Sequence, residues 1–285
     1  MDQKIIDLFD RFTHGGMNRR SFFNRLVALT GSTAAASALL PLLQNNYARA
    51  ETVAADDARV KTETVAVPAG PAQLSGYLAR PAQADKSPAV LVVHENRGRN
   101  PHIEDIARRL AVEGYLALAL DFLSPIGGTP ADEDKAREMI GTLKEADIIA
   151  SGQAAIAYLR THPNANGKVG AIGFCWGGGV VNRLAVADPS LNAGVAYYGM
   201  QPPAADVARI KAPLLLHYAG LDERIDAGIP AYEAALKAAG KDYTLYMYEG
   251  VNHAFNNDTG SRYDKAAADL AWTRTLSFLQ QNLAS

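Results

Sequence analysis

The sequence predicts an α/β fold in which a mainly parallel sheet of about eight strands carries helices on both faces. Three observations support this prediction. Strand-like and helix-like segments alternate after residue 60, which is typical of successive βα units. Several strand-like segments are unbroken apolar runs, as strands buried on both faces of a parallel sheet require. The segments between them carry apolar residues at helical spacing.

A β-hairpin is the first predicted element of this fold. Residues 60–67 and 73–79 alternate between polar and apolar side chains, and Pro68-Ala69-Gly70-Pro71 between them has a turn-forming composition. Such a pattern predicts two antiparallel strands joined by a short turn. The apolar run Ala-Val-Leu-Val-Val-His at 89–94 follows, and it predicts the first strand that is buried on both faces.

The rest of the chain repeats the alternation of strand and helix up to the C-terminus. Gly114 ends the first helical segment. No internal repeat or linker interrupts the pattern, so residues 51–285 are predicted to form a single domain. Strands are predicted at 115–122, 169–174, 193–198, 213–219 and 243–248, helices at 103–113, 146–159, 176–187, 231–239 and 261–283, and a loop with a polar helix at 124–143.

The composition argues against several classes of protein. The 285 residues carry 28 basic and 30 acidic side chains, without the basic surface that nucleic-acid binding requires. A single cysteine rules out an intrachain disulfide, and no Cys cluster or His-x-x-x-His pair points to a metal site. Hydrophobic residues make up 48% of the chain, which suffices for a large core. We therefore expect a globular protein without a metal or a cofactor.

Residues 1–50 have the order of charged and apolar residues that is typical of an export signal. Arg19-Arg20 precedes two phenylalanines, a mildly apolar stretch runs from 26 to 43, and Ala48-Arg49-Ala50 has the small-x-small pattern of a cleavage site. Paired arginines before a weakly hydrophobic stretch resemble a twin-arginine signal. The pattern predicts recognition by the twin-arginine export machinery and a periplasmic or secreted mature chain without a membrane span. The alternatives are a cytosolic amphipathic helix at 19–43 or an uncleaved membrane anchor.

The sequence Gly-Phe-Cys-Trp-Gly at 173–177 lies between a predicted strand and a predicted helix. This context is typical of a nucleophile elbow, and it predicts an α/β-hydrolase fold with Cys175 as the nucleophile. The glycines allow the strand and the helix to pack closely. The N-terminus of the helix favours a thiolate and a developing oxyanion. The alternative is a buried structural cysteine beside a glycine-rich helix.

The partners of Cys175 are expected downstream, because the acid and then the histidine follow the nucleophile in this type of fold. Asp222 follows the strand at 213–219, and His253 lies in the loop after the last strand. Both positions are at the carboxyl ends of strands, where functional residues gather. An acid at 222 can hold the imidazole of His253 in the correct tautomer. The alternatives are a turn cap for Asp222 and a solvated loop histidine, while His217 lies inside a predicted strand.

The loop after the first buried strand adds a fourth candidate, Glu95. This loop supplies an oxyanion-hole amide in the α/β-hydrolase fold, so we expect donors from the backbone N–H groups of Asn96 and Trp176. A carboxylate at 95 can also hold the proton of Cys175 until the substrate arrives. The alternative is that Glu95 forms an ion pair with Arg97 or with another basic residue at the surface.

Glu95, Gly-Phe-Cys-Trp-Gly-Gly at 173–178, Asp222 and His253 together resemble the dienelactone hydrolases, also called carboxymethylenebutenolidases. The resemblance covers about residues 60–283. It implies a Cys-His-Asp triad that hydrolyses a small-molecule ester or lactone. It also implies that the glutamate holds the resting thiol and releases it when the substrate binds.

The residues expected to bind the substrate differ from the family pattern. The dienelactone hydrolases bind a substrate carboxylate with two arginines, one after the strand that matches 115–122 and one four residues after the triad histidine. This chain has Asp121-Phe122-Leu123 at the first position and Asn257 at the second. Arg97 is a candidate replacement. The residues expected to line the pocket, with core packing as their alternative, are Trp176, Tyr197 and Tyr198.

The activity predicted from these residues is a two-step hydrolysis through a thioester. Enol esters and lactones, whose leaving groups are stabilised, suit a cysteine nucleophile better than simple alkyl esters do. Two other classes of protein have the same sequence features. One is an exported binding or scavenging protein on a catalytically decayed hydrolase fold, and the other is a thioesterase or peptidase with the same triad.

Overall fold

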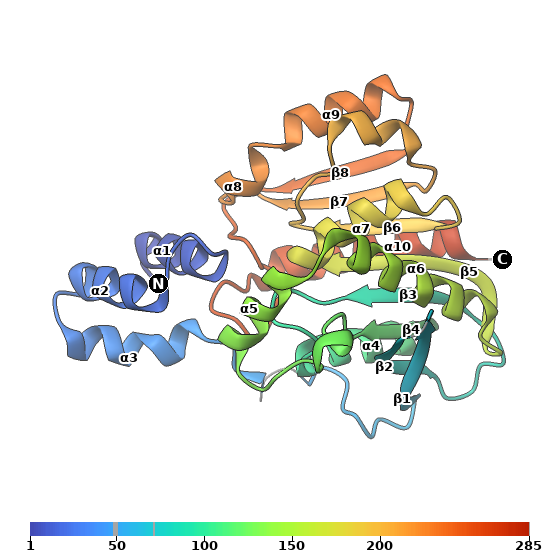
Figure 1. Cartoon of the computed structure of the whole chain (residues 1–285), viewed down its shortest axis with the longest axis horizontal. Coiled ribbons are helices and arrows are strands. Elements are labelled where there is room, and N and C mark those ends of the chain that lie inside the picture. The colour runs from blue at the N-terminus through green and yellow to red at the C-terminus, as the bar shows by residue number, and fades with distance from the viewer. Residues whose placement is uncertain (48–50, 71, 285) are drawn as a thin grey trace.

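An eight-stranded sheet forms the centre of the structure, a computed structural model that describes residues 1–47, 51–70 and 72–284. The strands are β1 (Val60–Ala69), β2 (Ala72–Pro81), β3 (Ser87–Val93), β4 (Leu116–Leu120), β5 (Ala165–Phe174), β6 (Ala193–Tyr197), β7 (Leu214–Ala219) and β8 (Tyr243–Tyr248). Their order is β1-β2-β4-β3-β5-β6-β7-β8, and every neighbouring pair from β4 to β8 is parallel (Figure 1). The predicted α/β-hydrolase fold is confirmed.

The predicted hairpin forms one edge of this sheet. In β1 and β2, Val60 pairs with Pro81 and Ala69 with Ala72, in antiparallel register. β2 also pairs antiparallel with β4, which joins the hairpin to the parallel strands. The side chain of Leu78 in β2 is buried on one face of the sheet. Its neighbours along the strand are partly exposed or small, so the alternating pattern of the sequence corresponds to one buried face of the hairpin.

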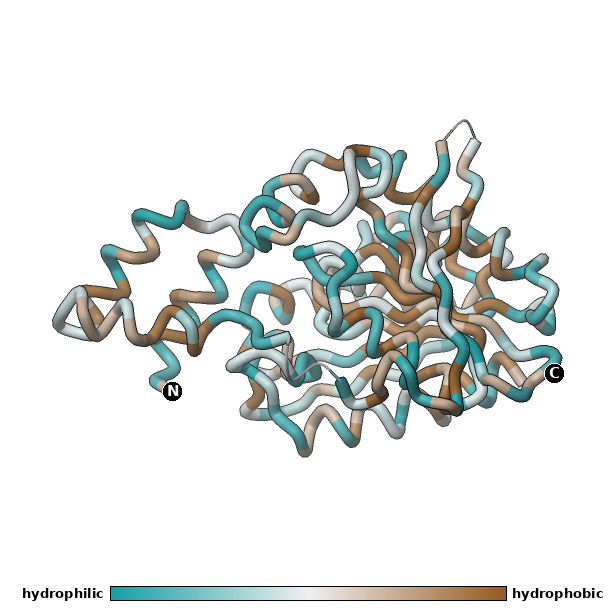
Figure 2. Tube along the Cα trace, turned by 90° about the horizontal axis from the view of Figure 1, so that it is seen from below, coloured by the Kyte–Doolittle hydropathy of each residue, from teal (hydrophilic) through white to brown (hydrophobic). Residues whose placement is uncertain are grey.

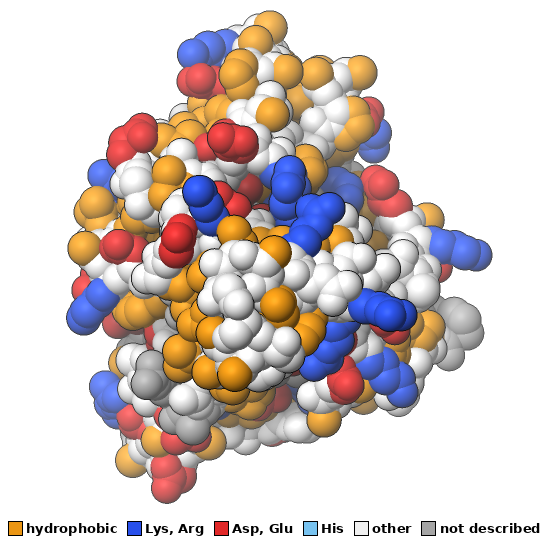
Figure 3. All heavy atoms as spheres, turned by 90° about the vertical axis from the view of Figure 1, so that its left-hand side faces the viewer, with side chains coloured by type: hydrophobic (Ala, Val, Ile, Leu, Met, Phe, Trp, Pro, Cys, Tyr) orange, Lys and Arg blue, Asp and Glu red, His pale blue; other side chains and the backbone are white. Residues whose placement is uncertain are grey.

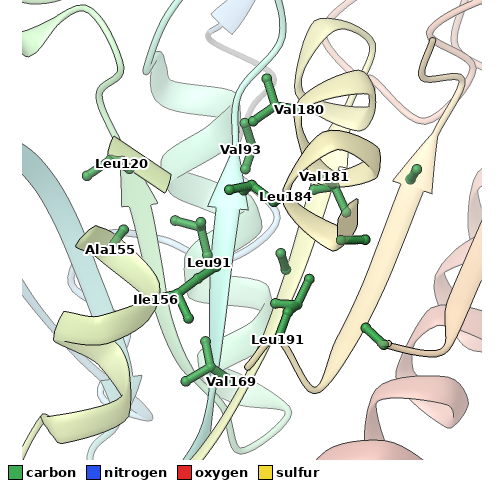
Figure 4. Close-up of a cluster of buried hydrophobic side chains, with 14 of the residues drawn as sticks. Leu91, Val93, Leu120, Ala155, Ile156, Val169, Val180, Val181, Leu184 and Leu191 are labelled. Atoms are coloured by element: carbon green, nitrogen blue, oxygen red, sulfur yellow. The ribbon is translucent and has the colours of Figure 1, made fainter. Parts of the chain in front are cut away.

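Two hydrophobic cores cover the two faces of the sheet. The helices that build them are α4 (Pro101–Val112), α6 (Glu145–Thr161), α7 (Trp176–Ala187), α9 (Ile229–Ala238) and α10 (Lys265–Leu283). Successive side chains of β3 point to opposite faces, so Leu91 and Val93 join the core under α6, α7 and α9, while Val90 and Val92 join the core under α4 and α10. Figure 4 shows the first of these cores. Each fully buried aliphatic side chain contributes about 1.5–3 kcal/mol.

Most predicted elements are present with shifted ends. The strand at 243–248 and the helix at 176–187 have the predicted bounds. The last helix begins at Lys265 rather than at residue 261, because Asp264 accepts a hydrogen bond from the N–H of Ala267 and caps the helix there. The predicted polar helix is α5 (Glu133–Thr142). The short helical segments of the sheet domain that were not predicted are α8 (Glu223–Asp226) and the 3₁₀ helices at Ser124–Ile126 and Ala204–Arg209.

Three helices precede the sheet and pack against one another. They are α1 (Gln3–Thr13), α2 (Arg19–Thr30) and α3 (Thr33–Leu43). Their apolar side chains form a core of their own, in which the rings of Phe12 and Phe22 stack with centroids 4.6 Å apart. Figures 1 and 2 show that this N-terminal segment, residues 1–47, projects from one end of the sheet.

The N-terminal segment consists mainly of the three helices α1, α2 and α3. The amphipathic helix considered for residues 19–43 is broken at Gly31, whose φ is 79°, into α2 and α3. The cleavage pattern Ala48-Arg49-Ala50 lies outside the described residues. Among the residues described, no single helix is long and apolar enough to cross a membrane, and α2 with α3 meets that criterion only as a pair bent by 115°.

The N-terminal segment carries apolar side chains at its surface. Leu29 of α2 and Leu42 of α3 are among the large hydrophobic residues that remain exposed. Figure 3, which faces this segment, shows hydrophobic groups gathered there with Lys and Arg side chains around them. The buried side of the same helices faces the loops at the carboxyl ends of the strands, and this arrangement brings the segment to the candidate site.

Candidate active site

Cys175 stands at a sharp turn between β5 and α7. Its φ of 56° and ψ of −115° lie in a region that residues with a side chain rarely adopt. Close packing holds the turn in place. A Cβ at position 177 would lie 2.4 Å from the carbonyl oxygen of Val93, and a Cβ at position 173 would lie 2.1 Å from that of Gly177. Both positions therefore require glycine, and the turn presents the thiol at the carboxyl end of the central strands.

Asp222 and His253 meet beside this turn. Asp222 follows β7 and caps α8, and its Oδ2 accepts a hydrogen bond from Nδ1 of His253 in the loop after β8. Asp222 is therefore both a helix cap and a partner of His253, although the sequence presented these as alternatives. Both side chains are almost completely buried, so His253 is not a solvated loop histidine.

The charges around His253 favour its protonated form. Burial by itself lowers the pKa of His253, but the negative charges of Asp222 and Cys175 outweigh it and raise the pKa to about 9. For Asp222, burial raises the pKa, but the charge of His253 and its hydrogen bond lower it further, so the net pKa is below its usual value. At neutral pH the pair is thus an imidazolium and a carboxylate.

The N-terminal segment places a second histidine against Cys175. Nε2 of His14, which follows α1, lies 3.3 Å from Sγ of Cys175. The ring of His14 packs edge-on against that of His253 with centroids 4.6 Å apart. One ligating atom from each of the three side chains lies within 4.8 Å of the other two. The thiol is thus enclosed by two imidazoles from opposite ends of the sequence.

Polar contacts fix α1 in this position. Arg262 forms an ion pair with Asp10, and Nδ2 of Asn96 donates a hydrogen bond of 2.8 Å to the carbonyl oxygen of Thr13. Burial by itself raises the pKa of Asp10, but a hydrogen bond from His14 and the surrounding positive charges hold it well below its usual value. The segment therefore meets the loops around the site through charged and polar groups as well as through apolar packing.

Glu95 lies close to Cys175 but its carboxylate is held by another residue. Nδ2 of Asn257 donates a hydrogen bond of 2.7 Å to Oε2 of Glu95, and both side chains are buried. Arg97 forms an ion pair with Glu133 at 3.2 Å, so the Glu95–Arg97 pair considered from the sequence is replaced by two separate contacts. A small cavity of about 20 Å³ is lined by Glu95, Arg97, Asn257 and Cys175, among others.

Two backbone N–H groups near the thiol are free to donate. Asn96 follows β3, and Trp176 is the first residue of α7. The first N–H groups of a helix have no partner within it, and neither N–H donates a hydrogen bond to another described residue. Both residues line the same cavity as Cys175. An oxyanion formed there would meet donors from two different loops.

A cavity of about 1050 Å³ opens beside Cys175. Its wall includes Trp176, Tyr198, Ile140 and Met200 from the sheet domain and Phe12, His14 and Met17 from the N-terminal segment. The ring of Tyr198 lies 4.9 Å from that of His253, measured between centroids. Apolar walls with a few convergent polar groups are typical of sites for small molecules. Trp176 and Tyr198 thus occupy the pocket wall where they were expected.

Tyr197 and His217 lie behind the site, in the core. Both side chains are fully buried and bind Oγ1 of Thr275, at 2.7 Å for the tyrosine hydroxyl and 3.1 Å for Nε2 of the histidine. Burial, with a smaller contribution from Arg274, lowers the pKa of His217 to about 3. His217 is therefore a neutral core residue, and Tyr197 follows the core-packing alternative rather than lining the cavity.

His14 is the residue at the site that sequence reasoning missed, because residues 1–50 were assigned to a leader. A signal for its helix was available: Ile5, Phe9 and Phe12 recur at helical spacing after Asp2, which caps α1. No local pattern indicates that the end of this helix meets a loop more than 150 residues away. The contact of Asn257 with Glu95 is equally long-range.

Comparison with known proteins agrees with this geometry. Residues 74–283 match the family model described as the Dienelactone hydrolase family. A Saccharolobus solfataricus protein named "Putative carboxymethylenebutenolidase" is 33% identical over 246 residues, which cover 74% of this chain and 95% of that protein. The N-terminal segment lies outside the matched family residues.

Solved structures give the same result. The "Putative Dienelactone Hydrolase" of Klebsiella pneumoniae aligns with a TM-score of 0.72 at 28% identity, and the alignment covers 78% of this chain and 99% of that one. A dienelactone hydrolase-like promiscuous phosphotriesterase from metagenomic libraries aligns with a TM-score of 0.71 at 26% identity, covering 79% of this chain and 100% of that one.

Proposed function

Since the chain belongs to the dienelactone hydrolase family, we propose that Cys175 is the nucleophile with which this hydrolase cleaves an ester or lactone. The observation that carries the proposal is the meeting of three separate loops at one thiol. Cys175 stands on the elbow, Asp222 follows β7, and His253 follows β8 with its Nδ1 on Asp222. Such a set is recognised by its geometry and roles rather than by sequence position.

The reaction runs in two steps through a thioester. The Cys175 thiolate attacks the carbonyl carbon, and the N–H groups of Asn96 and Trp176 stabilise the charge on the carbonyl oxygen. The imidazolium of His253 gives its proton to the leaving alkoxide or enolate, which departs. His253 then takes a proton from water, the resulting hydroxide cleaves the thioester, and the acid leaves with Cys175 again a thiolate.

Glu95 regulates the thiol in this proposal. It accepts the proton of Cys175 in the resting state and is displaced from the thiol when the substrate enters. The small cavity that both side chains line supports this role, and Asn257 supplies the hydrogen bond that keeps the Glu95 carboxylate in place. Enol esters and lactones are the proposed substrates, because a thiolate displaces a stabilised leaving group most readily.

The test is the hydrolysis of activated esters and enol lactones by the Cys175→Ala variant. We expect kcat/KM to fall by at least about a thousandfold, since the nucleophile is removed. Ser277→Ala, on the exposed face of α10, is the matched control and should keep full activity. Undiminished turnover by Cys175→Ala would remove the thiol from the mechanism.

Two measurements separate the competing classes. A thiol-directed acylating probe labels an activated Cys175 rapidly, whereas a decayed site that only binds ligands would react like an ordinary buried thiol. A panel of thioesters and peptides beside lactones separates an ester or lactone hydrolase from a thioesterase or peptidase. The highest kcat/KM in that panel identifies the class of substrate.

We also propose that the first 50 residues direct export by the twin-arginine route to a periplasmic or secreted location. Arg19 and Arg20 stand at the exposed start of α2, where a receptor can reach them. Replacing both with lysine should retain the protein inside the cell, as measured by fractionation. Unchanged export would contradict the proposal.

A further inference from the structure

His14, Cys175 and His253 form a set of potential metal ligands built from three separate parts of the chain. The Nε2 of His14 and the Sγ of Cys175 are 3.3 Å apart, and one ligating atom from each residue lies within 4.8 Å of the others. Two atoms bound to one tetrahedral Zn²⁺ through Zn–S and Zn–N bonds lie about 3.5 Å apart. The distance between Nε2 of His14 and Sγ of Cys175 is already close to this value. The distances from these two atoms to His253 would reach it after a movement of about 1 Å.

Both imidazoles are oriented in the manner of metal ligands. Nδ1 of His14 lies 2.8 Å from the backbone oxygen and 3.3 Å from the carboxylate of Asp10, and Nδ1 of His253 lies on the carboxylate of Asp222. Metal-binding histidines usually donate one ring N–H to a carboxylate or carbonyl, which leaves the other nitrogen as the ligand. Each histidine therefore has Nε2 available on the side of Cys175.

A second observation points independently to a ligand. His253 is 3% exposed, and its Nε2 has no hydrogen-bond partner among the described residues. Leaving a buried polar atom without a partner costs about 1–3 kcal/mol. A cation held by this nitrogen would satisfy it, and the open cavity beside Cys175 leaves room for water as a fourth ligand.

We propose that, while residues 1–50 remain attached, His14, Cys175 and His253 bind a borderline divalent cation such as Zn²⁺, which blocks the thiol and fastens the N-terminal segment over the cavity. A thiolate with two imidazoles is a donor set that zinc prefers. Binding releases to solvent the Nε2 proton of the His253 imidazolium as well as the proton that Cys175 holds in the resting state, and the carboxylates of Asp10 and Asp222 add negative charge behind the ligands. Metal binding stands apart from the proposed function, whereas inhibition by the metal rests on it.

No sequence pattern indicates this site, because its three ligands share no local spacing. The sequence patterns that usually indicate a metal site are clustered cysteines and paired histidines along a helix, and this sequence has neither. Here one ligand ends α1, one stands on the elbow and one lies in the loop after β8. Only the docking of the N-terminal segment completes the set.

The test is titration of the full chain, stripped with a chelator, with Co²⁺ and then with Zn²⁺ as a competitor. We expect one Co²⁺ per chain, tetrahedral d–d absorption and a thiolate-to-cobalt charge-transfer band, all removed by Zn²⁺. His14→Ala should weaken binding by at least about tenfold, and Asp10→Asn by about 10- to 100-fold as an outer-shell change. Cys175→Ala should abolish the charge-transfer band. His162→Ala, away from the site, is the matched control and should bind as the parent does.

The outcomes separate this inference from the proposed function. Absence of stoichiometric binding, or binding that survives His14→Ala unchanged, would overturn the metal site even if Cys175→Ala abolishes hydrolysis. Loss of binding in His14→Ala together with full hydrolysis by Cys175→Ala would keep the metal site and overturn the nucleophile. Hydrolysis assays of the parent with Zn²⁺ and then with chelator should show reversible inhibition.

Discussion

His253 is the residue in which burial and charge oppose each other most directly. Burial disfavours its imidazolium, but Asp222 and Cys175 raise its pKa to about 9. Because this value lies above that of an unfolded histidine, about 6.5, protonation of His253 stabilises the fold fully below about pH 6.5. That contribution is lost as the pH rises through 9.

This raised pKa predicts the alkaline limb of the pH–rate profile. In chelator-treated protein, kcat/KM for an activated ester should fall above about pH 9, where His253 loses the proton that the proposed mechanism transfers to the leaving group. Asp222→Asn removes the negative charge that favours the imidazolium, so the limb should move to lower pH and kcat should drop by about 10²- to 10⁴-fold. A limb that stays in place in the variant would show that Asp222 does not set the pKa of His253.

Among single residues, those with a local signal were predictable and those with a distant partner were not. Cys175, Asp222 and His253 each follow a recognisable strand, and the carboxyl ends of parallel strands meet at one edge of the sheet. The hydrogen-bond partner of Glu95 lies 162 positions away in the sequence and could not be predicted. It is Asn257 rather than Arg97.

At the scale of elements, the contact between α7 and the ends of β3 and β5 sets the position of the thiol. Gly177 touches the carbonyl oxygens of Val93 and His94, and a Cβ there would come within 2.5 Å of both. The helix cannot accept this without moving away from the sheet. A Cβ at Gly179, two residues further along the helix, would have its nearest atom at 3.4 Å, which is an ordinary van der Waals contact.

These two glycines form a matched pair for a stability test. Gly177→Ala should lower the free energy of unfolding by about 1–3 kcal/mol, as overpacking does, and should reduce kcat by displacing Cys175. Gly179→Ala should be neutral or slightly stabilising, because alanine favours the helix. Urea unfolding and ester hydrolysis of both variants measure the difference. Equal effects of the two substitutions would contradict the role assigned to the α7–β3 contact.

Helices and strands whose apolar residues repeat at a regular spacing were predictable from the sequence. The short helix α8 and the helix α1 were not. The hairpin of β1 and β2 and the helix α7 follow directly from alternation and from a turn beside a helical pattern. α8 has four residues, too few to show a period, and its start depends on Asp222 as a cap. The helix α1 has a clear apolar face, but its position ahead of a signal-like stretch led to a different interpretation.

At the scale of the whole molecule, the N-terminal segment and the sheet domain have separate cores. Among the residues that the structure describes, neither core of the sheet domain includes one before Val53, and the core of α1, α2 and α3 includes none after Leu43. The two parts meet at the cavity beside Cys175, where Phe12, His14 and Met17 form part of the wall. The cores of the sheet are therefore complete without the segment, whereas the wall of the cavity beside Cys175 is not.

This separation predicts the result of removing the segment. A chain that begins at Glu51 should fold and unfold cooperatively, because both cores of the sheet are intact. It should also gain about tenfold in kcat/KM for bulky esters relative to small ones, since part of the cavity wall is gone. Circular dichroism and a series of esters of increasing size measure the two effects. A size preference equal to that of the full chain would show that the segment does not shape the cavity.

Because Cys175 is the only cysteine in the sequence, its surroundings determine how the protein withstands oxidants. With a single cysteine in the chain, a sulfenic acid formed on Cys175 has no resolving thiol, so its repair depends on a thiol supplied from outside. Further oxidation to the sulfinic acid would end activity permanently. Cys175 is 8% exposed and has His14 across its sulfur, so the end of α1 lies between the sulfur and peroxide from that side. While it remains attached, the segment that narrows the entrance for substrates thus also covers the thiol against oxidation.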